Sequence, residues 1–402
     1  MEKRLKIKEV LERGVEKIYP SKKVLKEVLL SRKKIKIYQG FDPSMPDLHL
    51  GHLVGILKLK QFQELGHKVI FLVGDFTGMI GDPTDRLLAR KKLTRKQVLE
   101  NAKNWREQVG RFLKFSGRNP AQMMFNSKWL DKLTFKDLIE ITSRFTVQRI
   151  LERNFFQRRL ERKRPIFLHE FLYPVAQAID CVEMDVDLEI GATDQTFNML
   201  IGRDLMKALK GKEKFVLTTK LLVDKRGRKM GKTAGNAVFL NASPGEMFGK
   251  IMAFPDEVII LAFELLTTLS LKTIKILEGQ LKKKKINPMD LKKKLAFEIV
   301  KLNYGERKAS DAEKEFKKVF QKREIPSKIK EFKVKKNKIK LLDLLFDSKL
   351  APSKSEAKRL ILQEGVKING VVQKDWKKEI KIKKGMIIQV GRRRFVKIKT
   401  QN

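Results

Sequence analysis

The first 240 residues or so alternate between strand-like and helix-like segments, and this alternation restricts the possible folds more than any other feature. Residues 34–41 alternate polar and apolar side chains as a strand does, and residues 68–74 (KVIFLVG) form the unbroken apolar run of a buried parallel strand. Such alternation builds a parallel sheet with helices on both faces, so we predict a Rossmann-like, doubly wound α/β fold. Further strands are expected at 121–126, 185–190 and 214–217, and helices at 50–65, 95–115, 167–179 and 195–209.

The remainder of the chain differs in pattern. Residues 241–325 are predicted to form an α-helical domain, the lysine-rich stretch 326–340 a linker, and residues 341–402 a small α+β domain. With an α/β domain over 1–240 this gives three domains, as a length of 402 residues allows.

The charge is strongly basic and unevenly spread. The chain carries 90 Lys and Arg against 47 Asp and Glu, a formal net charge of +43. Residues 281–402 hold +24 of it and residues 1–280 hold +19. This excess favours a polyanionic partner, with nucleic acid ahead of a membrane surface, and a solvated lysine-rich surface is the alternative. A hydrophobic fraction of 42% excludes a disordered polycation.

Targeting segments and disulfides are not expected. No run reaches the roughly 18 apolar residues of a membrane-spanning helix. The start, MEKRLKIKEVLERGVEK, lacks an apolar core and carries glutamates, so neither a secretory signal nor a transit peptide fits. Cys181 is the single cysteine and cannot form an internal disulfide. Together these features predict a cytoplasmic protein.

The first candidate site follows the strand at 34–41. His49 and His52 lie three residues apart, so they share one face at the start of the expected helix, for which Asp47 is a candidate N-cap. A helix N-terminus favours phosphate, two imidazoles can donate hydrogen bonds to it, and Gly51 lets a nucleotide approach. Two ordinary surface histidines are the alternative. A metal pair is less well supported, because no cysteine or third histidine lies nearby.

A second candidate site is the loop at 224–236, which contains KMGKT. Lys229 and Lys232 lie three residues apart and can clamp a triphosphate as point charges. A basic hairpin loop is the alternative in a chain this rich in lysine.

A third group lies between these two. Tyr173, Gln177 and Asp180 fall at i, i+4 and i+7, so on a helix they point one way and form a polar binding face. The sequence GATDQ at 191–195 then lies at a strand-to-helix turn, where a ribose or an ammonium group could bind. Each residue alone could be a helix cap or a surface polar group.

HLGH at 49–52 and KMGKT at 229–233 together resemble the HIGH and KMSKS signatures of class I aminoacyl-tRNA synthetases. With YQGFDPS, FQELGHKVIFLVGDFTGMIGDPT, EFLYPVAQAIDCVEMDVDLEIGATDQ and NMLIGR, nearly the whole chain resembles the tyrosyl-tRNA synthetases of bacterial type. The resemblance implies a HUP-type catalytic domain and activation of L-tyrosine by ATP to tyrosyl-adenylate, followed by transfer to the 3′-terminal adenosine of tRNA(Tyr).

The resemblance also implies roles for individual residues. The substrate phenol would hydrogen-bond to Tyr38 and Asp180. The ammonium group would be held by Tyr173, Gln177 and Asp82. The carboxylate would lie near Gln195. ATP would meet Gly40, Asp42, Ser44, His49, Gly51, His52, Asp194, Lys229 and Met230, with Lys232 and Thr233 closing over the phosphates. Arg86 matches a basic position of the family only approximately. Magnesium is expected to arrive with ATP, and no protein-bound metal is predicted.

The tail and one internal segment imply macromolecular partners. Residues 341–402 resemble the S4 RNA-binding domain, which implies phosphate contacts by Ser353, Lys354, Ser355, Lys358 and Arg359. Residues 127–151 resemble the dimer-forming segment of these enzymes, which implies a homodimer. The alternatives are a tryptophanyl enzyme, a small-molecule nucleotidyltransferase and a non-catalytic RNA-binding relative.

Overall fold

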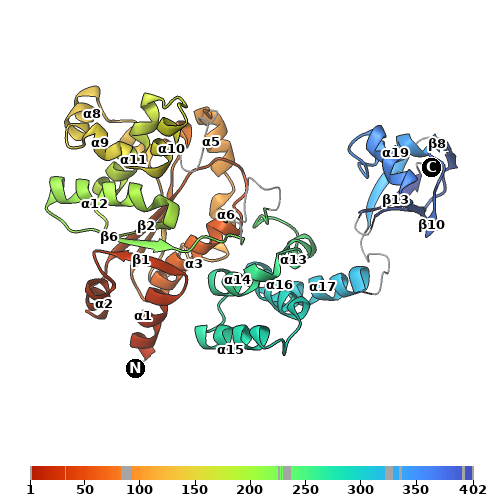
Figure 1. Ribbon diagram of the computed structural model, residues 1–402, viewed down its shortest axis with the longest axis horizontal. Helices are drawn as coiled ribbons and strands as arrows, with labels where there is room; N and C mark the ends of the chain where they lie inside the picture. The colour runs from red at the N-terminus through yellow and green to blue at the C-terminus, as the bar shows by residue number, and fades with distance from the viewer. Residues whose placement is uncertain are drawn as a thin grey trace. The chain divides into compact units, whose positions relative to one another are not determined.

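The computed structural model describes residues 2–31, 33–82, 92–224, 227, 229, 237–321, 329–334, 337–391 and 394–400. The chain divides into two compact units, Met1–Ala309 and Ser310–Asn402. Each unit contains a β-sheet of its own, the larger one in the first unit (Figure 1). In the described part of the chain, no helix combines the length and the apolar character that crossing a membrane requires.

The sheet of the first unit contains β1 (Val15–Tyr19), β2 (Lys36–Phe41), β3 (Lys68–Val73), β4 (Gln122–Phe125), β5 (Leu188–Ala192) and β6 (Phe215–Thr219). The strand order is β1-β6-β5-β2-β3-β4, with β1 antiparallel to β6 and all other pairs parallel. β2 lies between β3 and β5, so the chain winds away from it in two directions. In such sheets ligands bind beyond the carboxyl ends of the strands at this switch point. The predicted doubly wound fold is confirmed.

Helices surround this sheet and continue beyond it in the sequence. Those of the first unit are α1 (Glu2–Glu12), α2 (Lys22–Leu30), α3 (Leu50–Glu64), α4 (Thr77–Ile80), α5 (Arg95–Ala102), α6 (Trp105–Gly110), α7 (Ser127–Leu130), α8 (Phe135–Thr142), α9 (Val147–Leu151), α10 (Asn154–Glu161), α11 (Leu168–Glu183), α12 (Thr196–Lys210), α13 (Pro244–Met252), α14 (Ile259–Leu266), α15 (Leu271–Lys282) and α16 (Pro288–Tyr304). α17 (Glu306–Phe316) spans the division between the two units.

Side chains of β2 alternate between the two faces of the sheet. Tyr38 packs in a buried cluster with Cys181 of α11 and Met206 of α12. The next residue, Gln39, faces α3, where Gly55 leaves the space it needs, because a Cβ at Gly55 would lie 2.0 Å from Gln39 Oε1. Helices therefore cover both faces of the sheet, as Figure 1 shows.

Several elements differ from their predicted bounds, and two of the differences have a clear backbone cause. The helix expected over 95–115 is divided into α5 and α6, with Asn104 between them at φ −99° and ψ 6°. The strand expected at 185–190 begins only at Leu188, because α11 continues to Glu183 and Asp185 then adopts a left-handed φ of 46°. Both differences lie at turns, where short polar residues allow several backbone conformations.

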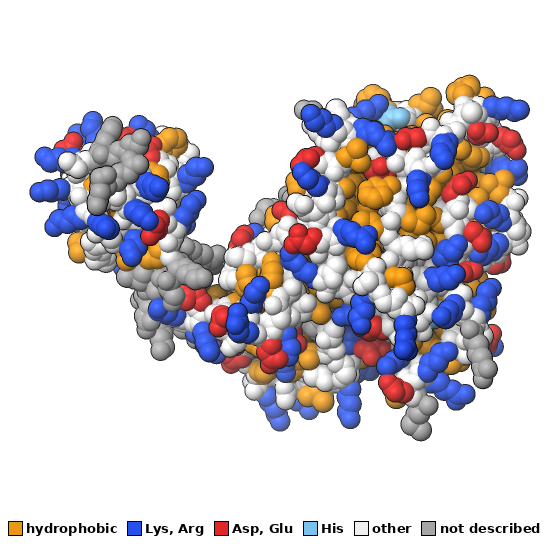
Figure 2. All heavy atoms as spheres, turned by 180° about the vertical axis from the view of Figure 1, so that it is seen from behind, with side chains coloured by type: hydrophobic (Ala, Val, Ile, Leu, Met, Phe, Trp, Pro, Cys, Tyr) orange, Lys and Arg blue, Asp and Glu red, His pale blue; other side chains and the backbone are white. Residues whose placement is uncertain are grey.

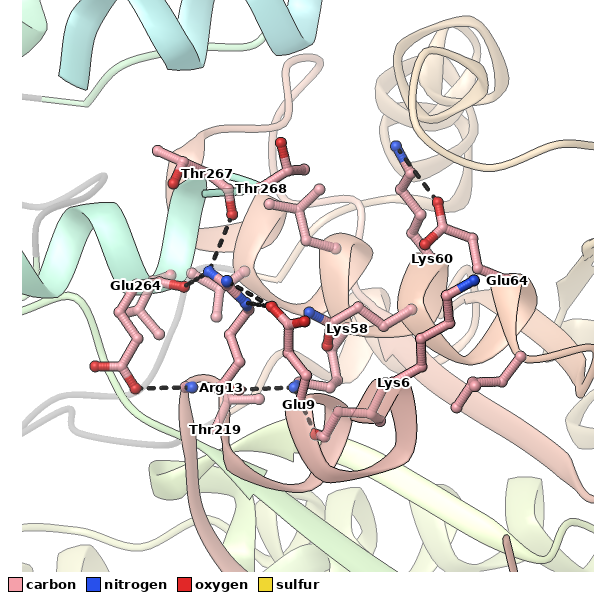
Figure 3. Close-up of a pocket in the computed structure, with 17 residues that line it drawn as sticks. Lys6, Glu9, Arg13, Lys58, Lys60, Glu64, Thr219, Glu264, Thr267 and Thr268 are labelled. Atoms are coloured by element: carbon pink, nitrogen blue, oxygen red, sulfur yellow. Dashed lines mark hydrogen bonds and ion pairs between the residues drawn. The ribbon is translucent and has the colours of Figure 1, made fainter. Parts of the chain in front are cut away.

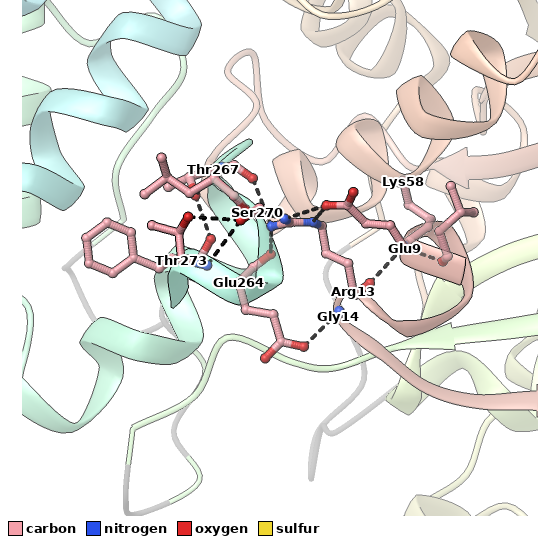
Figure 4. A network of polar contacts seen from close by, with 11 residues as sticks. Glu9, Arg13, Gly14, Lys58, Glu264, Thr267, Ser270 and Thr273 are labelled. Atoms are coloured by element: carbon pink, nitrogen blue, oxygen red, sulfur yellow. Dashed lines mark hydrogen bonds and ion pairs between the residues drawn. The ribbon is translucent and has the colours of Figure 1, made fainter. Parts of the chain in front are cut away.

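A buried arginine joins the N-terminal helix to the helical region. Arg13 donates from Nη1 to the carbonyl oxygens of Glu264 and Thr267 at 3.2 and 3.3 Å (Figure 4). Lys58 of α3 donates to the carbonyl oxygens of Val10 and Arg13 at 2.8 and 2.7 Å. The space left between α1, α3 and the end of α14 is a cavity of about 220 Å³ (Figure 3). These bonds help to hold α14 against the sheet in one compact unit.

The second unit has a core of its own. Its strands are β7 (Lys330–Val334), β8 (Lys338–Lys340), β9 (Val366–Ile368), β10 (Val371–Val372), β11 (Glu379–Lys381), β12 (Ile387–Val390) and β13 (Arg394–Thr400), and its helices include α18 (Leu341–Asp347) and α19 (Lys354–Leu362). The main sheet has the order β10-β9-β12-β13-β7, and β11 pairs with β8. Leu344 of α18, Ile361 of α19 and Ile388 of β12 are fully buried in this core.

The stretch predicted as a linker, 326–340, differs from that prediction where it is described. β7 pairs in parallel with β13, and β8 pairs antiparallel with β11. Phe332 and Val334 alternate with Glu331 and Lys333, and Val334 is 6% exposed, so one face of the strand covers the core of the second unit. Charge alone therefore did not distinguish a solvated linker from an edge strand.

Candidate active site

A cavity of about 370 Å³ opens at the carboxyl ends of β2 and β5. It is bordered by the loop after β2, the first turn of α3, one face of α11 and the turn after β5. Met230, Lys232, Thr233 and Arg86 lie outside the described residues. The other residues predicted to bind tyrosine and ATP all line this cavity: Tyr38, Gly40, Asp42, Ser44, His49, Gly51, His52, Asp82, Tyr173, Gln177, Asp180, Asp194, Gln195 and Lys229.

The deep end of the cavity contains the Asp180 carboxyl group, which is 3% exposed. It accepts hydrogen bonds from Trp129 Nε1 at 2.8 Å and from Asn126 Nδ2 at 3.2 Å. Burial raises the pKa of Asp180 well above its usual range, and these two donors act in the opposite direction. The sequence did not single out Asn126, because its partner lies 54 residues away.

The second polar group of the deep end is the Tyr38 hydroxyl. Tyr38 is 1% exposed and donates to Glu189 Oε1 at 2.5 Å. Gln177 Nε2 donates to the same oxygen at 2.9 Å. Lys214 forms an ion pair with the other oxygen of Glu189. Neither Glu189 nor Lys214 was predicted, because each stands beside other charged residues in the sequence (DVDLEI and GKEKF) and no spacing marks it.

Hydroxyl and carboxyl groups continue along one wall. The Tyr173 hydroxyl donates to Asp42 Oδ2 at 2.8 Å, and the Thr77 hydroxyl donates to Asp42 Oδ1 at 2.7 Å. Gly74 permits this approach, because a Cβ there would lie 2.2 Å from Asp42 Oδ1. Tyr173 and Asp42, predicted on separate motifs, therefore form one hydrogen-bonded pair.

Asp82 also lines the cavity, where it lies between a guanidinium and an amide. Arg153, which is 4% exposed, donates from Nη2 to Asp82 Oδ1 at 3.1 Å, and Gln195 Nε2 donates to Oδ2 at 2.6 Å. Because Gln195 Nε2 is bound to Asp82, Gln195 Oε1 is left as an acceptor, and it accepts from Asn198 Nδ2 at 2.9 Å. The Arg153 contact was not predicted from the sequence.

The two histidines cap the helix that carries them. His49, not Asp47, is the N-cap of α3, and its Nδ1 accepts from the Gly51 amide at 3.1 Å. His52 Nδ1 accepts from the His49 amide at 3.1 Å, and the two rings stack with centroids 3.8 Å apart. Because Nδ1 accepts in both rings, the neutral imidazoles carry their proton on Nε2 and can donate from that atom.

The amide groups at the start of α3 are already engaged by the protein. The Leu50 amide donates to the Val238 carbonyl oxygen at 3.0 Å, and the His52 amide donates to the His49 carbonyl oxygen at 2.9 Å. Asp47 instead accepts from Asn241 Nδ2 at 2.9 Å. The open cradle of helix amides expected from the sequence is therefore absent at these positions.

Lys229, the first lysine of the KMGKT sequence, reaches the mouth of the cavity. Its ammonium group lies 2.6 Å from Asp194 Oδ2, and its side chain is 38% exposed. The other carboxylate oxygen, Asp194 Oδ1, is buried and has no hydrogen-bond partner among the described residues. A buried carboxylate oxygen in the wall of a cavity is a strong acceptor for a ligand hydroxyl.

Two family models match this chain. The model described as tRNA synthetases class I (W and Y) matches residues 30–321, and the model described as Tyrosine–tRNA ligase SYY-like C-terminal domain matches residues 315–398. The tyrosine–tRNA ligase of Moorella thermoacetica is 41% identical over 397 residues, which cover 97% of this chain and 95% of that protein. The tyrosine–tRNA ligase of Thermotoga maritima is 42% identical over 391 residues, covering 97% and 96%. The chain belongs to the class I tyrosine–tRNA ligases.

Solved structures agree with this ligase family at the level of the fold. A C-terminally truncated mitochondrial tyrosyl-tRNA synthetase from Aspergillus nidulans gives a TM-score of 0.66 at 22% identity, over 78% of this chain and 94% of that one. A tyrosyl-tRNA synthetase from Archaeoglobus fulgidus, complexed with L-tyrosine, gives 0.61 at 20% identity, over 78% and 100%. The predicted class I catalytic fold and the tyrosyl family are confirmed.

The C-terminal unit of this ligase presents the residues predicted to meet RNA on or beside α19. The Ser353 hydroxyl caps the helix by accepting from the Glu356 amide at 3.1 Å. Lys354 pairs with Asp343 at 2.5 Å, and Arg359 pairs with Glu356 at 2.7 Å. Lys358 Nζ lies 4.3 Å from the centroid of the Trp376 ring. Ser355 is exposed beside them.

Proposed function

We propose that the cavity at the carboxyl ends of β2 and β5 is where this tyrosine–tRNA ligase joins L-tyrosine to ATP. The observation that carries the assignment is the buried deep end formed by Asp180 and Tyr38. A site built to hydrogen-bond a substrate hydroxyl rejects the analogue that lacks it, because the buried polar groups of the site are then left unpaired. The phenol of tyrosine fits this end, and the indole of tryptophan does not supply a hydroxyl there.

We assign the ammonium group of tyrosine to the acceptors on the walls. Gln177 directs its amide nitrogen to Glu189, so its Oε1 is the atom that can accept from an ammonium group. Asp82 supplies negative charge and Tyr173 a hydroxyl oxygen on the same cavity wall. Gln195, which is bound to Asp82, is assigned to the carboxylate end of the substrate.

ATP is assigned to the opposite end of the cavity. Asp194 Oδ1 is suited to accept a ribose hydroxyl. Gly40, Asp42, Ser44 and Gly51 line the path between this carboxylate and the two histidines, which would donate from Nε2 to the phosphates. Lys229 would supply positive charge at the mouth, with Met230, Lys232 and Thr233 of the same loop as further predicted contacts.

The reaction proceeds in two displacement steps. A carboxylate oxygen of tyrosine attacks the α-phosphorus of ATP, the new C–O–P bond forms, and pyrophosphate leaves with the electron pair of the broken P–O bond. A ribose hydroxyl of the tRNA 3′-terminal adenosine then attacks the tyrosyl carbonyl carbon and gives up its proton, the ester bond forms, and AMP leaves with the electron pair of the broken C–O bond. The protein's part is to align the reactants and to stabilise the charge that develops on the phosphate.

Magnesium is inferred to enter with the triphosphate. Mg²⁺ prefers phosphate and water oxygens and keeps near-octahedral geometry, so it needs no protein cage of its own. Within the ranges that the structure describes, no group of three or more His, Cys, Asp or Glu side chains could hold a metal ion. The cation would neutralise the charge on the β- and γ-phosphates while His49 and His52 act on the side of α3.

We infer that the second unit holds tRNA(Tyr) by its phosphates. Lys354, Lys358 and Arg359 are exposed on α19, and exposed cations of this kind position an RNA without reading its bases. The double substitution Lys354→Ala and Lys358→Ala should weaken tRNA binding and reduce its salt slope by about two. Tyrosine-dependent pyrophosphate exchange, which needs no tRNA, should stay unchanged, and an unchanged tRNA affinity would refute the inference.

We infer that the enzyme is a homodimer, joined through the segment from α8 to α11. Its large apolar side chains are unusually exposed, including Phe135 at 79%, Val147 at 60% and Leu168 at 77%. An apolar surface of this kind is typical of an interface with a second copy of the same chain. Phe135→Glu should convert a dimer into a monomer in sedimentation velocity, and a wild-type monomer would contradict the inference. A cytoplasmic setting stays a prediction.

The amino-acid assignment has one decisive test. ATP–pyrophosphate exchange is measured with each of the twenty amino acids, and only tyrosine should stimulate it strongly. Stimulation by tryptophan instead of tyrosine would overturn the assignment. Absence of exchange with every amino acid, in a protein that still binds tRNA, would favour a non-catalytic RNA-binding role.

A further inference from the structure

A second cavity, between α1, α3 and the end of α14, takes no part in the proposed reaction. It has a volume of about 220 Å³ and combines apolar walls with a few charged side chains (Figure 3). The apolar side chains come from all three elements: Val10, Leu57, Leu65 and Leu265. A concave, mostly apolar space with a small number of polar groups is typical of a site for a small molecule.

The charges around this cavity do not balance. Each described carboxylate on its walls forms an ion pair with a cation of the protein: Glu9 with Arg13, Glu264 with Lys220, and Glu64 with Lys60. Lys6, another cation of the walls, pairs with Glu2. Lys58 of α3 is the lining cation that has no carboxylate partner within the described ranges.

Lys58 is also the most deeply placed of these lysines, since it is 4% exposed. Its ammonium group donates to the carbonyl oxygens of Val10 and Arg13, which accounts for two of its three N–H donors. Burial, followed by the charge of Arg13, lowers the pKa of Lys58 to about 7, and Glu9 and Glu264 act in the opposite direction. The cavity therefore contains a buried positive charge that no ion pair neutralises, which is costly to maintain.

We propose that this cavity binds a small organic anion, a carboxylate with a short aliphatic chain. Its carboxylate group pairs with the Lys58 ammonium group, and its chain lies against Leu57 and Leu265. One unbalanced positive charge matches a singly charged anion better than a phosphate dianion. Gln61, on the same wall, has a buried Oε1 without a hydrogen-bond partner in the described chain, and a half-turn of this amide presents its NH₂ group to the anion.

The proposed site is separate from the catalytic cavity but adjoins it. Val54 of α3 and Thr219, the last residue of β6, line both cavities, so the two share a wall. The residues predicted to bind tyrosine and ATP line the other cavity. A carboxylate at Lys58 and the two substrates can therefore be bound at the same time.

The first test is calorimetric titration of the full-length enzyme with pentanoate at pH 6.5. Pentan-1-ol and pentan-1-amine are the uncharged and cationic probes of matched size. Pentanoate should bind once per chain and roughly tenfold or more tightly than either, because its hydrogen bond to Lys58 is assisted by charge. Saturation with tyrosine and a non-hydrolysable ATP analogue should leave this Kd unchanged. Equal binding of the alcohol, the absence of saturable binding, or displacement by the substrates would overturn the proposal.

The pH dependence identifies the cation in the wild-type enzyme. Pentanoate is ionised throughout pH 6 to 9, whereas Lys58 must take up a proton to pair with it. Its affinity should thus fall by about tenfold per pH unit above pH 7, and binding at pH 8 should take up about one proton. Proton uptake is measured from the heats in buffers of different ionisation enthalpy. An exposed lysine, with a pKa of roughly 10.4, stays charged over this range, so a flat profile would contradict the proposal.

Two variants assign the site to one side chain. Lys58→Met keeps the length of the side chain and removes its charge, and it should weaken pentanoate binding roughly tenfold or more and abolish the pH dependence. Lys60→Met is the matched control on the same helix, because Lys60 also lines the cavity but pairs with Glu64, and its pentanoate affinity should equal that of the wild type. A folded Lys58→Met variant with wild-type affinity refutes the proposal. If that variant does not fold, the pH profile of the wild type decides.

Discussion

The two ends of the cavity are built in different ways. At the tyrosine end, Asp180 and Tyr38 are 3% and 1% exposed, and buried partners fix their hydrogen bonds. At the ATP end, Lys229 is 38% exposed, and the histidines and Asp194 are only partly buried. Selection of an amino acid requires polar groups that a wrong substrate leaves unpaired, which demands burial. Phosphate chemistry requires charge and donors that meet the substrate when it arrives.

The largest effect is expected from Asp180→Asn. One side of the new amide is an NH₂ group, which must face either the Trp129 or the Asn126 donor, so the deep end loses an acceptor and gains a repulsive contact. We expect kcat/KM for tyrosine to fall by about a thousandfold or more while KM for ATP changes little. A fall of less than tenfold in a folded variant would break the contrast between the two ends.

His52→Ala tests the ATP end. Removing a donor that acts on the developing charge should lower kcat for adenylate formation about a hundredfold. Tyrosine affinity, measured by fluorescence titration or equilibrium dialysis, should stay within twofold. If tyrosine affinity falls as much as the rate, the two ends are not separate in function.

Trp129→Phe sharpens the comparison inside the tyrosine end. The substitution keeps an aromatic ring but deletes the N–H group that donates to Asp180 Oδ1 at 2.8 Å. KM for tyrosine should rise about tenfold, less than for Asp180→Asn, because the carboxyl group itself remains. Equal KM values for the variant and the wild type would show that Asp180 needs no such support.

The smallest effect concerns stability away from both ends. His67 is 4% exposed, its Nδ1 accepts from the Ile35 amide at 3.4 Å, and burial together with Lys3 and Lys34 lowers its pKa to about 4. The unfolded chain takes up a proton near pH 6.5, so stability is lost as the pH falls from 6.5 through 4. Tm should drop by a few degrees over this range.

The matched variant for this effect is His67→Asn. The amide oxygen can accept from Ile35 without binding a proton, so this variant should lose less Tm than the wild type between pH 6.5 and 4.5. Identical acid slopes for the two proteins would assign the acid sensitivity to other groups. Tyrosine preference at pH 7.5 should be the same in both.

The basic side chains are spread over the surface and are not confined to the active site. Figure 2 shows lysine and arginine side chains scattered over the visible surface of both units. Many of them pair with nearby carboxylates, as Lys250 does with Glu246 and Lys207 with Glu213. The net charge therefore pointed to a nucleic-acid partner but did not locate the catalytic site.

The sequence alone predicted the doubly wound sheet and many of the residues that line the cavity. The switch between polar alternation and apolar runs predicted the parallel sheet, because side-chain periodicity reports which faces of an element are buried. The i, i+4, i+7 spacing of Tyr173, Gln177 and Asp180 placed them on one helical face, and all three line the cavity. These inferences succeeded because they depend on geometry within single elements.

Only the tertiary structure decided what those residues contact. Tyr38 and Glu189 are 151 positions apart and meet because β2 lies beside β5. No local pattern marks Glu189 or Lys214, since each is one of several charged residues in its stretch of the sequence. The choice of His49 over Asp47 as the helix cap likewise depended on Asn241, from a distant loop, binding Asp47. The spatial order of the strands in the sheet sets contacts such as that of Tyr38 with Glu189, and residue spacing along the chain does not encode that order directly.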